Sequence, residues 1–184
     1  MRELEPYNYL WWKQLTTLYI YTEQHNKALI TLQQADRAGF ELSEQLLILM
    51  AQLYAQNKVP QKAGETYARL KSLESRPELL AQQATYWQLA KEWSKASSSW
   101  RKAATLDQKY YWQHTLLMLK LNDFTAALAS INQLSEITSD VLLAKTQALS
   151  ALGHRSQALQ VVTELHKVDP SDNSLHWIKY LTKD

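Results

Sequence analysis

Apolar residues recur along the chain with the spacing of one helix face, and short polar turns interrupt these helical stretches. Small residues mark the pattern regularly: Ala28, Ala63, Ala96, Ala127 and Ala158 follow one another at intervals of 35, 33, 31 and 31 residues. We interpret each alanine as opening the second helix of a helix-turn-helix hairpin, where a small side chain lets two helices approach closely. The pattern therefore predicts an all-α protein.

The repeat frame covers almost the whole chain and predicts a single domain, residues 1–184. We place five repeats near residues 9–42, 43–74, 75–106, 107–138 and 139–170, and a capping helix at 172–182. The capping helix carries Leu175, Trp177 and Ile178 on one amphipathic stripe. Such a cover is needed because the last repeat of an array otherwise leaves an apolar face in water.

Corresponding positions of the repeats carry similar residue types. The first repeat supplies Trp12, Leu15, Thr16, Tyr19, Ala28, Leu32 and Ala35, and the second supplies Leu47, Met50, Ala51, Tyr54, Ala63, Tyr67 and Leu70. In this pattern the chain resembles the tetratricopeptide repeat (TPR) family. The resemblance implies a right-handed α-solenoid in which Trp12, Tyr19, Tyr54, Tyr67, Trp87, Trp93 and Trp100 belong to the core.

Turn chemistry indicates where helices begin and end. The run Ser75-Arg76-Pro77-Glu78 reads as a capping box with proline in the first helical turn, which predicts a helix start there. Gly153 lies between two apolar-periodic segments and is typical of a tight turn between helices. The run 169–171, Asp-Pro-Ser, ends the last repeat.

Net charge, cysteine content and the length of apolar runs each narrow the possible functions. Twenty basic residues stand against eighteen acidic ones, so nonspecific attraction to nucleic acid is weak, and nucleic-acid binding is only a minor alternative. The chain has no cysteine, which leaves neither disulfides nor thiolate metal sites and keeps the compartment open. No apolar run reaches the roughly 18 residues that span a bilayer, so we expect no membrane-spanning segment.

No constellation typical of catalysis stands out. The five histidines are scattered without metal-ligand spacing, and the chain lacks both a glycine-rich phosphate loop and a nucleophile elbow. We therefore expect no enzyme activity, no metal, no cofactor and no small-molecule substrate. His114 falls where the repeat usually carries an inward leucine, and we expect a hydrogen-bonded histidine in the core or groove.

The TPR resemblance implies a function: a scaffold that binds a peptide or a protein partner along the concave groove lined by the first helices. Applied to this frame, it nominates an amide-rich, mildly basic set of groove residues: Lys13, Thr17, Tyr21, Gln52, Gln56, Gln88, Trp112, Leu116, Lys120 and Gln147. One alternative stays open, namely that the chain is the docking repeat domain of a larger protein.

A narrower resemblance concerns residues 9–105. The runs Leu18-Tyr19-Ile20-Tyr21-Thr22-Glu23-Gln24, Lys27-Ala28, Gly39-Phe40, Ala51-Gln52-Leu53-Tyr54 and Val59-Pro60 resemble the TPR proteins that accompany bacterial TonB/ExbB/ExbD energy-transduction systems. This resemblance implies a periplasmic accessory protein, whose targeting segment would then not be part of this chain.

The N-terminal hairpin carries more apolar residues than an end helix exposed to water should have. Tyr7, Leu10 and Trp11 form this apolar edge, and no polar cap precedes them. Apolar patches of this kind usually mark an interface. We expect that either preceding repeats of a longer protein or a second copy of the chain covers the edge.

Overall fold

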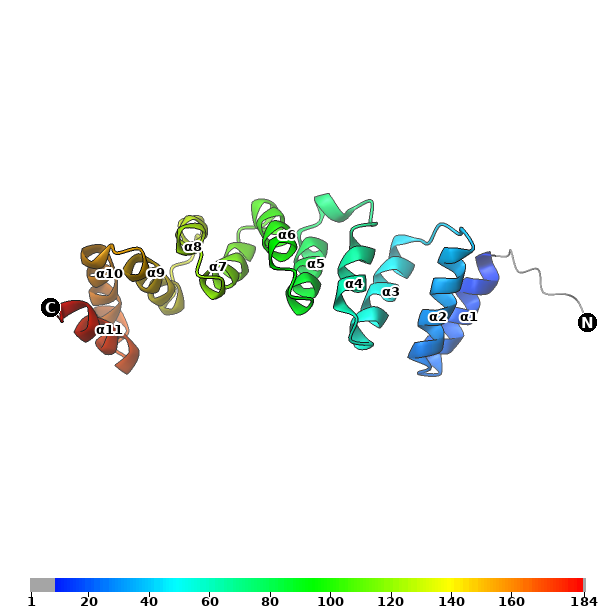
Figure 1. The fold of residues 1–184 in the computed structure, drawn as a ribbon, viewed down its shortest axis with the longest axis horizontal. Helices are drawn as coiled ribbons and strands as arrows, with labels where there is room; N and C mark the ends of the chain where they lie inside the picture. The colour runs from blue at the N-terminus through cyan, green and yellow to red at the C-terminus, as the bar shows by residue number, and fades with distance from the viewer. Residues whose placement is uncertain (1–8, 184) are drawn as a thin grey trace, which may run out of the picture. The chain divides into compact units, whose positions relative to one another are not determined.

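The computed structural model describes residues 9–183, and within this range all regular structure is helical (Figure 1). The elements are α1 (Tyr9–Tyr21), α2 (His25–Arg37), α3 (Glu44–Gln56), α4 (Pro60–Tyr67), a 3₁₀ turn η1 (Leu73–Ser75), α5 (Pro77–Leu89), α6 (Trp93–Leu106), α7 (Tyr110–Lys120), α8 (Phe124–Ile131), α9 (Ser139–Ala151), α10 (Arg155–Val168) and α11 (Asp172–Thr182). These five helix pairs and a final helix confirm the predicted all-α fold.

The chain divides into two compact units, Met1–Ala96 and Ser97–Asp184. In the first unit α1 packs on α2, α2 on α3, α3 on α4, and α4 on α5. In the second unit the same succession runs from α7 to α11. The single domain over 1–184 stays a prediction.

The alanines of the repeat pattern occupy equivalent places. Each is the fourth residue of the second helix in its pair, and each has 0% of its surface exposed: Ala28, Ala63, Ala96, Ala127 and Ala158. A side chain without atoms beyond Cβ allows the close helix approach that a larger residue would block. The spacing read from the sequence thus reflects a recurring packing site.

The turn inside each pair also has one geometry, which the sequence analysis recognised only at Gly153. A residue with positive φ stands two positions before the second helix in every pair: Glu23, Lys58, Lys91, Asn122 and Gly153. At the last of these, the Gly153 amide donates to the Ser150 carbonyl and the His154 amide to the Leu149 carbonyl. This is the Schellman motif, and the other four turns repeat its hydrogen bonds.

The predicted capping box at Ser75 is wrong. The helix does begin at Pro77, but its N-cap is Arg76, whose side chain makes no capping hydrogen bond. The Ser75 hydroxyl instead donates to the Ser72 carbonyl within η1, and Glu78 pairs with Arg76 at 2.8 Å. Proline at the first helical position lacks an amide hydrogen, so this helix start has one unpaired amide fewer.

The aromatic residues assigned to the core are only partly buried. Tyr67, Trp87 and Trp100 are buried, whereas Trp12, Tyr19, Tyr54 and Trp93 keep part of their surface exposed. In the second unit, Trp177 and Ile178 of α11 pack against the core as expected. Leu175 is exposed instead, and the buried leucine of this helix is Leu181.

Candidate partner-binding surfaces

The nominated groove residues of the first unit lie on the first helices of their pairs. Lys13, Thr17 and Tyr21 follow one another at four-residue spacing on α1, so they share one face, and Tyr21 is 86% exposed. Gln52 and Gln56 repeat that spacing on α3 and are exposed as well. The sixth residue, Gln88, is half-buried on α5.

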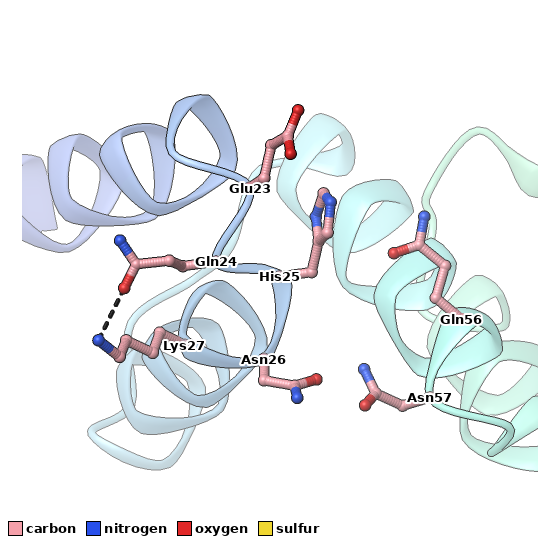
Figure 2. Close-up of a pocket in the computed structure, with 7 residues that line it drawn as sticks. All are labelled: Glu23, Gln24, His25, Asn26, Lys27, Gln56 and Asn57. Atoms are coloured by element: carbon pink, nitrogen blue, oxygen red, sulfur yellow. Dashed lines mark hydrogen bonds between the residues drawn. The ribbon is translucent and has the colours of Figure 1, made fainter.

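A polar hollow of about 460 Å³ lies beside this face in the first unit, between the start of α2 and the end of α3 (Figure 2). Its lining comprises Glu23, Gln24, His25, Asn26, Lys27, Gln56 and Asn57. Several of these groups already have local partners: the Lys27 ammonium donates to Gln24 Oε1 at 2.7 Å, and the Asn57 side-chain amide donates to the Leu53 backbone carbonyl. Gln56 is the one nominated groove residue that the hollow contains.

In the second unit the nominated residues again share a first-helix face. Trp112, Leu116 and Lys120 are spaced by four on α7, and Gln147 lies on α9. Leu116, Lys120 and Gln147 are exposed, while the Trp112 indole is half-buried. We call the ten nominated residues of both units the first-helix face. That they line one continuous groove stays a prediction.

A larger hollow, of about 820 Å³, opens beside Trp112. We call it the Trp112 hollow, and its lining consists of Leu106, Asp107, Gln108, Lys109, Trp112, Leu134, Ser135, Glu136, Thr138, Asp140 and Val141. Two inter-repeat loops, one before α7 and one before α9, supply most of these residues. Trp112 and Leu134 pack on the buried side chains of Ile131, Val141 and Ala144, which fixes the apolar floor.

The lining of the Trp112 hollow carries more negative than positive side chains. The Lys109 ammonium lies 2.6 Å from Asp107 Oδ2, and this hydrogen bond holds the pKa of the Asp107 carboxyl below its ordinary value. Within the described residues, the carboxylates of Glu136 and Asp140 have no such cationic partner. The rim therefore carries an excess of negative charge.

The predicted site residues do not include the loop residues that line this hollow. Ser135, Glu136 and Thr138 lie in the loop between α8 and α9, outside the fixed positions of the repeat pattern. A signal was present, because two consecutive inter-repeat loops occupy equivalent places in neighbouring repeats and therefore meet on one side of the array. The apolar Leu134 in a polar stretch points to the same place.

The N-terminal edge lies only in part within the described residues. Tyr7 is outside them. Leu10 is 56% exposed, and Trp11 is half-buried with its ring 5.5 Å from that of Trp12 in an edge-to-face contact. Leu18 adds a further 55% exposed apolar side chain to α1. The described part of the edge thus presents apolar surface.

His114 lies in the core of the second unit, where it is hydrogen-bonded as expected. Its Nδ1 is 2.7 Å from the Ser130 hydroxyl and its Nε2 is 3.0 Å from the Ser97 hydroxyl. Burial, and then the positive charge of Arg101, lower the pKa of the imidazole. The ring is 5% exposed, so it contributes to packing rather than to a surface site.

Across residues 9–183, no three side chains among histidine, cysteine, aspartate and glutamate gather in a way that could hold a metal ion. None of the helices in this range is both long enough and apolar enough to cross a bilayer.

No protein-family model matches the sequence, and no curated protein matches it. Solved structures do match. A TPR protein from Parabacteroides merdae has a TM-score of 0.62 at 16% identity over 94% of this chain and 72% of its own. MamA gives 0.63 at 13% identity, covering 92% and 93%, and YrrB, described as a TPR protein with an unusual peptide-binding site, gives 0.62 at 14%, covering 91% and 90%. This chain therefore has the TPR fold.

Proposed function

We propose that this chain is a non-catalytic scaffold that binds a peptide or protein segment on its first-helix face. One observation carries the proposal: all ten nominated residues lie on the first helices of their pairs, eight of them exposed and two half-buried. Most of these side chains contact water, so packing inside the fold does not explain which residue types stand there.

The chemistry of the face suits an extended peptide. The side-chain amides of Gln52, Gln56 and Gln147 make no hydrogen bond to another described residue, and each can donate to a carbonyl and accept from an amide of a bound backbone. Tyr21 and Trp112 provide aromatic surface, which commonly anchors partners at interfaces. Amide groups recognise the main chain, and the aromatic groups add selectivity for side chains.

The likeness to YrrB supports a peptide as the partner, because that protein is described as having a peptide-binding site. The narrower role as a periplasmic accessory of a TonB-type system rests on the residue runs of the first hairpins, from Leu18 to Pro60, and stays part of the proposal. An alkaline-phosphatase fusion to the complete native gene product tests the compartment, because the fused enzyme is active only after export.

Selection from a random peptide library displayed on phage, with the full chain immobilised, tests the scaffold function. Enriched peptides should bind in calorimetry, and Tyr21→Ala, Gln52→Ala or Trp112→Ala should weaken one or more of them by about tenfold with unchanged circular dichroism. Gln160→Ala is the matched control, because Gln160 is exposed on the second helix α10. Absence of enriched peptides, or affinities that none of the face variants alters, would refute the proposal.

A further inference from the structure

The Trp112 hollow shares only Trp112 with the first-helix face, and it is an open hollow whose lining combines apolar side chains with an excess of carboxylates. We infer that it receives an apolar side chain of a peptide in which a lysine or arginine stands next to that side chain. This inference rests on the proposed function and names the class of partner that the second unit selects.

The size and floor of the hollow fit a side chain or two. Its volume of about 820 Å³ lies within the range of ligand pockets, roughly 300 to 1,000 Å³. Trp112 and Leu134 pack against a buried cluster, and Leu106, which also lines the hollow, is 50% exposed. A preformed apolar floor lowers the entropy cost of binding, because its side chains are already ordered.

The rim decides the charge of the partner. Asp107 and Lys109 neutralise each other, and the other two charged groups of the lining, Glu136 and Asp140, are both carboxylates. Asp140 also lies in the first turn of α9, where a negative charge stabilises the helix. Glu136 lies in the loop before α9 and has neither a helix to stabilise nor a hydrogen bond to another described residue. A cationic side chain of the partner would complement both carboxylates.

The peptide selection on the full chain provides the test, with defined outcomes for this surface. We expect enriched sequences in which leucine, phenylalanine or tryptophan is adjacent to lysine or arginine. Affinities measured with the synthetic peptides should fall about fivefold or more on Glu136→Lys, and Asp140→Asn should weaken them further. Trp112→Ala should cost about tenfold or more.

Glu164→Lys is the matched control, because Glu164 is an exposed carboxylate on α10 away from the lining. It should leave the affinities unchanged, which separates a local effect from a change in net charge. Raising the salt concentration should weaken binding to the wild type more than binding to the Glu136→Lys chain. Because Glu136 is an exposed loop residue, this variant also avoids any folding defect that loss of the Trp112 indole brings.

Two results would overturn the inference. Peptides that bind but lack basic residues, or whose affinity is indifferent to Glu136→Lys, would remove the acidic rim from recognition while leaving the scaffold function standing. Absence of any enriched peptide would overturn the inference and the scaffold function together.

Discussion

The hydrogen bonds around His114 indicate which nitrogen of its neutral ring carries the proton. The Ser130 hydroxyl donates its proton to the Ala126 carbonyl, so it accepts the hydrogen bond from the Nδ1–H of the imidazole. Nε2 is then the unprotonated nitrogen and accepts from the Ser97 hydroxyl. Burial, and then the positive charge of Arg101, disfavour a second proton on the ring.

We therefore predict that acid destabilises the fold partly through His114. Because the folded-state pKa is lowered from 6.5, the unfolded chain binds more protons below that pH, and the free energy of unfolding decreases as the pH falls through this range toward the folded-state pKa. Above it, this contribution is fully present. Urea melts at several pH values check the prediction against His114→Gln, which should lose part of the acid dependence. Equal pH dependence in both chains would contradict it.

The sequence alone does not explain why position 64, inside a helix, is a glycine. It lies inside the short helix α4, where alanine would ordinarily favour the helix by about 0.5–1 kcal/mol. A Cβ at this position would lie 2.7–2.9 Å from three ring carbons of Trp87, whose other contacts include the Lys95 ammonium 4.6 Å from the ring centre. The missing Cβ makes room for the indole.

Gly64→Ala should consequently destabilise the protein by about 1–3 kcal/mol, since overpacking outweighs the gain in helix propensity. Denaturant melts measure the change. In a Trp87→Leu background the same substitution should cost much less, because the ring that it meets is gone. An unchanged cost in that background would show that the penalty does not come from this contact.

At the scale of elements, the five turns inside the helix pairs share one backbone geometry but not one residue type. Lys58 and Lys91 hold φ near 60° although a side chain with Cβ disfavours that conformation, whereas asparagine and glycine accept it readily. A tight turn was predicted at Gly153 because glycine readily adopts the left-handed conformation that ends a helix. Lysine and glutamate give no such signal, so the repeat alanines predicted these turns but not their positive-φ residues.

Lys58→Gly should stabilise the chain by about 0.5–1 kcal/mol, because relief of the left-handed strain exceeds the extra entropy of the unfolded glycine. The Lys58 side chain is exposed, so little else is lost. Asn122→Gly should change stability less, and Gly153→Ala should destabilise by about 1–2 kcal/mol. Thermal melts of the three variants give the order, and a lower melting temperature for Lys58→Gly would contradict the argument.

The sequence predicted the helix pairs well and the binding surface only in part, for a physical reason. Packing positions such as Ala28 and Ala158 recur because the two helices of every repeat approach closely at the same place, so periodicity reveals them. The capping box at Ser75 was wrong because Arg76, not Ser75, occupies the N-cap position of the helix that begins at Pro77. The Trp112 hollow depends on two loops that meet in space, and loop residues such as Glu136 have no counterpart in a helical period.

At the scale of the whole molecule, the described surface includes an apolar strip on α1. Leu10, Leu18 and Tyr21 are all exposed, and their spacing places them on one side of the helix with Trp11 nearby. An apolar strip in water tends to associate, and the same strip on a second copy is complementary to it in a two-fold symmetric dimer.

We therefore predict that the chain self-associates through α1. Leu10→Gln combined with Leu18→Gln should raise the monomer fraction at high protein concentration, because burial of these side chains drives the contact. Sedimentation velocity over a range of concentrations measures that fraction. Leu175→Gln is a matched control, since Leu175 is an exposed leucine on α11 and should leave the monomer fraction unchanged. A wild-type chain that stays strictly monomeric at the highest concentration would contradict the prediction.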